Sequence, residues 1–225
     1  MRKPDFEKAT KLATHLLLLQ DLSERFLDVK TMRLDKNIVF TTYDEYAQLV
    51  GQDLPAYDKS NKNSPGNTGL YIERTVGKNT FFVIAYNDKE EIYERRNWTL
   101  AHEVGHVYMG HKTGKGIEEI EANYFAAQYF MPEYTLYKMR QEYGMFTAAD
   151  LSEIFGVSIE SAQKRIKTFN NKSLFDGSTE SRLIWERQKP KIDLYFKCKK
   201  TGEDFRFALE IENWYNEQMR ELLYH

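Results

Sequence analysis

The residues best suited to chemistry lie in the run 102–106, which reads His-Glu-Val-Gly-His. In an α-helix, two histidines four positions apart lie about 40° apart around the axis and roughly 5.4 Å apart along it, so both imidazoles can reach one metal ion. Glu103 is turned by about 100° from His102, which lets its carboxylate reach a metal-bound water without becoming a ligand. The spacing therefore predicts a hydrolytic zinc site with His102 and His106 as ligands and Glu103 as the base.

The sequence around this run favours a metal site over a structural helix that carries two histidines by chance. An active-site helix needs an apolar stripe to pack against the core. Such a stripe is formed by Trp98, Leu100, Ala101, Val104, Val107 and Tyr108. Gly105 lowers the helix propensity, so we expect another element to approach the backbone closely at this position.

A catalytic zinc site needs a third protein ligand and an open fourth position, and two histidines with one glutamate form a known set. The segment 117–132 has good helix formers and ends at a proline, so we expect a helix. Helical steps from Glu119 reach a face with two alanines that would allow close packing, so we predict that Glu119 is the third ligand. For Glu118 and Glu121 we favour exposure to solvent. Glu121 is the second choice as a ligand, because its face is wider and partly polar.

Two further polar residues lie near the predicted ligands in the sequence. Asn123 follows Glu119 by one turn, so it could accept a hydrogen bond from the outer nitrogen of a ligating histidine and fix its tautomer. The alternative is an exposed polar side chain. His111 lies about 140° around the helix from His106, which makes it a poor direct ligand if the helix continues. His111 or a tyrosine could donate to the oxyanion, and the spacing does not choose between them.

Three runs of this sequence resemble the ImmA/IrrE family of metallo-endopeptidases. They are Thr-Leu-Ala-His-Glu-Val-Gly-His at 99–106, Glu-Ile-Glu-Ala-Asn-Tyr-Phe-Ala-Ala at 119–127 and Phe-Met-Pro at 130–132. The resemblance is close over residues 75–135 and implies a compact zinc peptidase of the gluzincin type. It also implies a role for each matching residue: His102 and His106 as ligands, Glu103 as base, Glu119 as third ligand and Asn123 as its helical neighbour.

The better-known members of that family are bacterial and phage-borne enzymes that cleave a partner transcriptional repressor. The resemblance therefore implies Zn2+ as the cofactor and a protein substrate, namely a helix-turn-helix repressor of a phage or mobile element. Tyr129 and Phe130 stand where the family often shows two leucines before Met-Pro. The shape of the nearby substrate groove need not follow the family for this reason.

Composition predicts a cytoplasmic protein. The 225 residues carry a formal net charge of −2, which provides no bulk attraction to nucleic acid or to an anionic membrane. The single cysteine, Cys198, excludes an internal disulfide framework and suits a reducing compartment. The apolar run 16–19 is far too short to span a bilayer, and Asp5 and Glu7 do not suit a secretion signal. Apolar residues at helical spacing over 12–26 predict instead a helix that packs against the peptidase core.

A two-residue period predicts strands at 38–42, 70–74 and 80–86, and hence a small sheet. Between the first two strands we expect a helix at 43–50 and a polar loop at 53–68, which is either a flexible connection or a rim over the cleft. In zinc peptidases of this general design, an edge strand beside the active-site helix can hold the substrate backbone by strand addition. The strands 70–74 and 80–86 are both candidates for that role.

Residues 147–167 predict two helices joined by a turn at Gly156, with Ser158 capping the second helix. This segment resembles a helix-turn-helix. Its second helix carries polar and basic side chains that could contact DNA, namely Gln163, Lys164, Arg165 and Lys167. Glu153 and Glu160 dilute this charge, so we favour packing or partner docking over direct DNA binding.

The C-terminal region shows a different pattern. Residues 170–181 have the composition of a linker. Alternation over 191–198 predicts a strand, 201–204 a turn and 205–209 a strand that pairs back. Residues 212–224 predict an amphipathic helix. The resemblance does not extend to this region, and its role stays open.

The predicted organisation is a zinc metallopeptidase domain over 1–145, a helix-turn-helix-like segment over 146–170 packed on it, and an extension of unknown role over 171–225. The predicted class is α+β: a mainly helical zinc-peptidase core with a small β-sheet, followed by the helix-turn-helix-like segment and a small C-terminal α+β tail. The predicted function is that of a zinc-dependent endopeptidase. The alternative is a non-catalytic regulator that binds DNA or a partner and has only a structural metal site.

Overall fold

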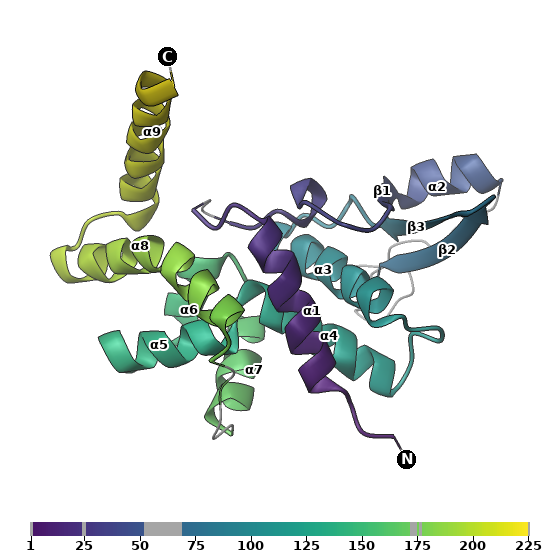
Figure 1. Cartoon of the computed structure of the whole chain (residues 1–225), viewed down its shortest axis with the longest axis horizontal. Helices are drawn as coiled ribbons and strands as arrows, with labels where there is room; N and C mark the ends of the chain where they lie inside the picture. The colour runs from purple at the N-terminus through teal and green to yellow at the C-terminus, as the bar shows by residue number, and fades with distance from the viewer. Residues whose placement is uncertain (1, 24–25, 52–68, 172–174, 176, 225) are drawn as a thin grey trace. The chain divides into compact units, whose positions relative to one another are not determined.

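The computed structural model describes residues 2–23, 26–51, 69–171, 175 and 177–224 of the chain. Within these residues it contains nine α-helices, a short 3-10 helix at Val29–Thr31 and one three-stranded sheet (Figure 1). This composition confirms the predicted mainly helical α+β class. The polar loop predicted at 53–68 lies outside the described residues.

The chain divides into two compact units. The first consists of Met1–Leu19 and Asp28–Phe130, and the second of Gln20–Leu27 and Met131–His225. The domain boundaries predicted at 145 and 170 stay predictions, because a compact unit need not be an independently folding domain.

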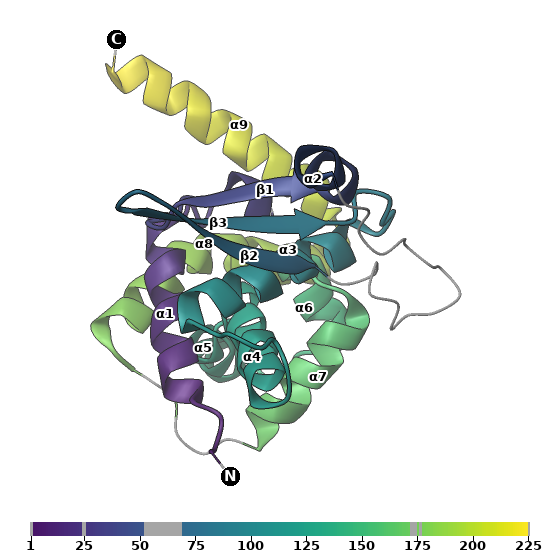
Figure 2. The same cartoon turned by 90° about the vertical axis from the view of Figure 1, so that its right-hand side faces the viewer.

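The first unit contains a sheet made of β1 (Ile38–Thr42), β2 (Leu70–Val76) and β3 (Asn79–Tyr86), which confirms the three predicted strands. Their order is β1-β3-β2, with β3 parallel to β1 and antiparallel to β2 (Figure 2). Strands β2 and β3 form a hairpin in which Gly77 adopts a φ of 62°, a conformation that a tight hairpin turn requires and glycine tolerates. In the described sheet, β3 is therefore the central strand and β2 is an edge strand.

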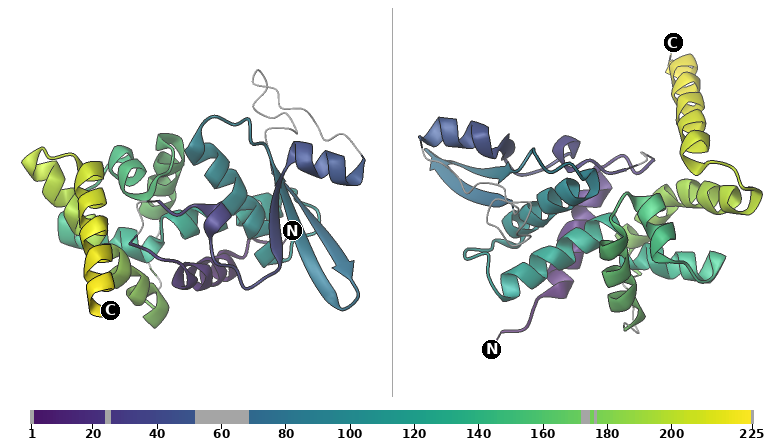
Figure 3. Two further views of the ribbon diagram at one scale, coloured as in Figure 1. Left: turned by 90° about the horizontal axis from the view of Figure 1, so that it is seen from above. Right: turned by 180° about the vertical axis from the view of Figure 1, so that it is seen from behind.

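The α-helices described in the first unit are α1 (Phe6–Leu19), α2 (Tyr43–Val50), α3 (Tyr93–Met109) and α4 (Ile117–Phe130). Helix α2 packs against the sheet, with Tyr43 and Tyr46 against Ala85 (Figure 3). Helix α1 packs against α3 and α4 through a buried face formed by Ala9, Ala13, Leu16 and Leu17. The predicted N-terminal helix and its packing are thus confirmed up to Leu19, and its predicted continuation to residue 26 is wrong because α1 ends there. None of the described helices combines the length and the apolar composition that a bilayer-spanning segment requires.

Helices α3 and α4 pack together closely at Gly105, as expected from the sequence. A Cβ atom at this position would lie 3.0 Å from the ring of Phe125 and 3.2 Å from the carbonyl oxygen of Ala122. A side chain at position 105 would therefore push the two helices apart. The glycine lies one residue before His106 and the alanine one turn after Glu119, so this contact also determines how closely those two side chains approach.

The second unit is helical in its described residues, with α5 (Glu133–Tyr143), α6 (Ala148–Phe155), α7 (Ile159–Asn170), α8 (Thr179–Thr201) and α9 (Phe205–Tyr224). Helices α6 and α7 correspond to the two helices predicted over 147–167. Thr147 and Asp150 form a capping box at the start of α6, and the oxygen of Ser158 accepts a hydrogen bond from the backbone of Ser161 at 3.1 Å. Gly156 ends α6 with a φ of 63°, which allows the turn between the helices.

The predicted C-terminal strands are wrong. Helix α8 continues through the segment 191–198, and α9 begins at Phe205, so the described tail is α-helical and not α+β. The buried positions of α8 recur every three or four residues: Ser181, Ile184, Trp185, Gln188, Lys191, Ile192, Tyr195 and Cys198. This helical period extends over the whole of α8 and outweighs the short alternation at its end, which by itself resembled a strand.

Arg165 is not available for the DNA contact that its position in the sequence suggested. Its side chain is buried, with Nε 2.9 Å from the carbonyl oxygen of Met131 and Nη1 3.3 Å from Oε1 of Glu133. Lys164, its neighbour, is exposed and pairs with Glu160 on the same helix. The guanidinium of Arg165 therefore joins α7 to the start of α5 and stabilises the second unit.

Replacing Arg165 with alanine should lower the free energy of unfolding by about 3–5 kcal/mol, because it leaves the carboxylate of Glu133 buried without its cation. Lys164→Ala should change this free energy by no more than about 0.5 kcal/mol, because its ion pair is exposed. Urea unfolding followed by circular dichroism measures both. Equal losses for the two variants would contradict the structural role of Arg165.

Candidate metal centre

Helices α3 and α4 bring the three predicted metal ligands together. The Nε2 atoms of His102 and His106 lie 3.0 Å apart. The carboxylate of Glu119 reaches both rings, with Oε2 3.3 Å from Nε2 of His102 and Oε1 3.2 Å from Nε2 of His106. One ligand atom from each residue can be chosen so that all lie within 4.8 Å of one another. The structure thus places these three residues around one point.

The chemistry of this donor set suits a divalent cation. Two unprotonated ring nitrogens that face each other at this distance repel unless a proton or a cation lies between them. Two imidazoles and one carboxylate are a donor set found in catalytic zinc sites. Burial, together with the neighbouring His102, lowers the pKa of His106, which favours the neutral ring that binds metals.

These side chains line a cleft of about 850 Å³ within the first unit. Its walls come from β2, from α3, from residues 111–114 and from α4. The side chain of Glu119 is 44% exposed, whereas that of His106 is 2% exposed. The three predicted ligands are therefore buried at His106 and exposed to the cleft at Glu119, which leaves room for a fourth ligand.

Glu103 lines the same cleft and is 5% exposed. Burial raises the pKa of Glu103 to about 7, although the charge of His102 opposes the shift. A carboxyl group of this kind can take up and return a proton near neutral pH. Gly69, which precedes β2, lies directly against it, and a Cβ atom there would collide with Cγ of Glu103. The strand thus approaches the predicted base so closely that only glycine fits.

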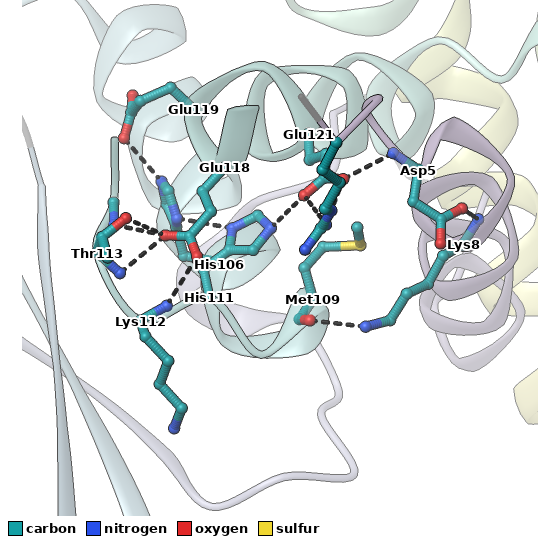
Figure 4. A network of polar contacts seen from close by, with 12 residues as sticks. Asp5, Lys8, His106, Met109, His111, Lys112, Thr113, Glu118, Glu119 and Glu121 are labelled. Carbon is teal, nitrogen blue, oxygen red and sulfur yellow. Dashed lines mark hydrogen bonds and ion pairs between the residues drawn. The ribbon is translucent and has the colours of Figure 1, made fainter. Parts of the chain in front are cut away.

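A second set of polar residues, whose arrangement the sequence did not predict, lies behind His106. Nδ1 of His106 lies 2.9 Å from Nδ1 of His111, and Nε2 of His111 lies 2.9 Å from Oε2 of Glu121 (Figure 4). Glu121 accepts hydrogen bonds from Nη2 of Arg2 at 2.7 and 2.8 Å and from the backbone nitrogen of Asp5 at 2.6 Å. A continuous chain of contacts therefore connects the N-terminal segment to a predicted ligand.

The position of Glu121 contradicts the sequence prediction, which favoured exposure to solvent and gave Glu121 as the second choice for a metal ligand. Its side chain is fully buried, and the groups that meet its carboxylate belong to Arg2, Asp5 and His111. Arg2 and Asp5 lie more than 110 positions away in the sequence, so the local period of α4 could not reveal them. The available signal was Phe125, which follows one turn later on the same face and is buried.

His111 reaches His106 because α3 ends at Gly110, where a φ of 73° reverses the chain. The backbone nitrogen of His111 then donates to the carbonyl oxygen of His106 at 3.1 Å. The predicted angle of about 140° applied only to a continuous helix. Both ring nitrogens of His111 face buried partners, so the ring is positioned to orient His106 and not to donate to an oxyanion in the cleft.

Asn123 does not occupy the position behind His106. It is exposed, lines the cleft and donates from Nδ2 to the carbonyl oxygen of Glu119 at 2.8 Å. This agrees with the alternative interpretation of an exposed polar side chain. The outer nitrogen of His106, which Asn123 was expected to meet, contacts His111.

Two further residues hold the walls of the cleft in place. Tyr71 of β2 stacks on the ring of His106 with centroids 5.4 Å apart, and its hydroxyl donates to the carbonyl oxygen of His111 at 2.6 Å. Glu118 accepts hydrogen bonds from the backbone nitrogens of Lys112, Thr113 and Gly114. Desolvation opposes the shift, but these bonds lower the pKa of Glu118 to about 2. Glu118 thus binds the backbone of the turn at 112–114 and is not part of the candidate metal site.

Residues 64–167 match the family model of Peptidase_M78, described as the IrrE N-terminal-like domain. This part of the chain is similar to that domain family. The match confirms the resemblance found in the sequence and includes the predicted ligands and Glu103. The similarity indicates a peptidase of the metallopeptidase type. Searches of curated proteins and of solved structures found no significant match.

Replacing Glu119 with alanine should weaken zinc binding by more than about 100-fold, beyond the loss typical of residues that act from behind a ligand. Glu73→Ala is the matched control, because Glu73 lines the same cleft but pairs with Lys112. Metal content after dialysis and competition with a chromophoric chelator measure the effect. If both variants retain zinc equally, Glu119 is not a ligand.

Proposed function

We propose that this chain is a zinc-dependent endopeptidase that hydrolyses a peptide bond in a protein substrate. The observation that carries the proposal is the convergence of His102, His106 and Glu119 at the buried side of a cleft that Glu103 also lines. The match to the peptidase family model supports the peptidase part, and the donor set supports the choice of zinc.

The residues of the cleft have two roles in the proposed reaction, metal binding and proton transfer. The two histidines and Glu119 would hold the ion. A zinc ion held there would lower the pKa of a bound water and polarise the scissile carbonyl. Glu103 takes one proton from the attacking water as the carbon–oxygen bond forms, and it returns that proton to the leaving nitrogen as the carbon–nitrogen bond breaks. The low exposure of Glu103 limits the loss of this proton to solvent.

Strand β2 is the better of the two candidates for binding the substrate backbone. Residues 70–74 of β2 line the cleft, whereas β3 lies between β1 and β2 and has both edges paired. An extended peptide could therefore add to the free edge of β2 as a further strand. Tyr71 connects this strand to the rear of the metal centre, so a peptide on β2 would lie close to the ligands.

The resemblance supports a helix-turn-helix repressor of a phage or mobile element as the substrate. If a neighbouring gene encodes a helix-turn-helix repressor, incubating that repressor with this chain and zinc, with and without a chelator, tests this assignment. Cleavage at one site that disappears with the chelator would support it. Cleavage of unrelated proteins at the same rate would limit the proposal to a general endopeptidase.

Glu103→Gln should leave zinc bound and lower the rate of proteolysis by about 100- to 10,000-fold, because the amide cannot accept the proton of the attacking water. The rate of substrate cleavage and the zinc content of the same preparation are measured together. Glu7→Gln, at an exposed position of α1, should retain both. Unchanged cleavage by the Glu103 variant would refute its role as the base.

Gly69→Ala should lower kcat by roughly 100-fold with little loss of zinc, because the added methyl group displaces the carboxylate of Glu103 or the strand beside it. Gly77→Ala, in the turn after the same strand, is the control. A Cβ atom there meets nothing within 4 Å, so it strains the turn and lowers thermal stability without moving Glu103. Equal kcat values for the two variants would argue against a close fit at position 69.

A further inference from the structure

We propose that Arg2, Glu121 and His111 form a relay of hydrogen bonds that fixes the tautomer of His106 and strengthens metal binding. The inference rests on the zinc site proposed above and extends it to residues outside the ligand set. It makes the N-terminal segment part of the metal centre, although Arg2 and Glu121 are 119 positions apart.

The direction of each hydrogen bond in the relay follows from its two ends. If His106 binds a cation through Nε2, its proton must lie on Nδ1, and that nitrogen must donate. The partner 2.9 Å away is Nδ1 of His111, which must therefore be unprotonated and accept. His111 then carries its proton on Nε2 and donates to Oε2 of Glu121 at 2.9 Å. A carboxylate can only accept, so every proton position agrees with the ligand role of His106.

Glu121 supplies the charge that holds this arrangement. Its side chain is 0% exposed, and an ionised carboxylate in such a place must be satisfied by hydrogen bonds and a counter-ion. Arg2 supplies the positive charge and contacts both oxygens, while the backbone nitrogen of Asp5 and the ring of His111 supply further donors. With the carboxylate held in this way, His111 has a strong acceptor in one fixed direction.

The N-terminal segment is attached to both helices that carry the site. Arg2 and Asp5 contact α4 through Glu121, and Nζ of Lys8 donates to the carbonyl oxygen of Met109 at the end of α3 at 2.7 Å (Figure 4). Tyr71 of β2 stacks on the ring of His106. The ring of His106 is thus held at its outer nitrogen by the relay and on its face by β2.

A relay and a purely structural brace predict different results for the same variants. His111→Phe keeps a ring but removes both nitrogens, and Glu121→Gln keeps the shape but removes the charge. Each should weaken zinc binding by about 10- to 100-fold in competition with a chromophoric chelator. Arg2→Ala should cause a smaller loss, and Lys3→Ala, which removes the same charge one position later, should cause none.

Nitrogen NMR of the full-length zinc-loaded protein, labelled at histidine, measures the tautomer of each histidine. A purely structural brace would not fix these tautomers. We expect the proton of His106 on Nδ1 and that of His111 on Nε2, and a mixture of His111 tautomers in Glu121→Gln. A proton on Nδ1 of His111 in the unaltered protein would overturn the relay.

Folded His111→Phe and Glu121→Gln variants that bind zinc as tightly as the unaltered chain would also overturn it. If these variants do not fold, Arg2→Ala decides, since Arg2 is 64% exposed. Zinc affinity equal to that of Lys3→Ala would then overturn the relay and leave the proposed function intact. If the unaltered chain binds no zinc, the proposed function fails together with the relay.

Discussion

The candidate metal centre depends on the contact between α3 and α4, which is close because position 105 has no side chain. The ring of Phe125 and the carbonyl oxygen of Ala122 occupy the space that a Cβ atom would need. A glycine inside a helix costs about 1 kcal/mol relative to alanine. In this chain the cost is offset by a geometry in which a carboxylate of α4 reaches two imidazoles of α3, a distance that bulkier packing would prevent.

Three glutamates of α4 show how surroundings assign different roles to one residue type. Glu118 binds the backbone of the turn at 112–114, Glu119 faces the two histidines, and Glu121 is buried under the N-terminal segment. All three occur within four positions and have similar helix propensity. Their roles differ because their partners differ. The partners of Glu118 lie in the turn just before α4, those of Glu119 lie on α3, and Arg2 and Asp5, which bind Glu121, lie at the start of the chain.

The second unit shows the limits of patterns that are read over short windows. Helices α6 and α7 begin and end close to the predicted residues, because capping side chains and a glycine mark those ends locally. The strand predicted at 191–198 is instead part of α8, since the helical period that decides the structure runs from Ser181 to Cys198. Arg165 looked like a nucleic-acid contact in sequence, but its guanidinium lies against Met131 and Glu133 at the start of α5.

The sequence alone identified the pair of histidines, the glutamate between them and the family resemblance, because four-residue spacing on a helix is a local property that needs no partner. It also determined the strands of the sheet, whose alternation is local too. The tertiary structure decided which glutamate faces the histidines, why Asn123 points elsewhere, and that His111 and Glu121 lie behind His106. These outcomes depend on which surfaces cover α4 and on the chain reversal at Gly110, and they arise from contacts between segments far apart in the chain.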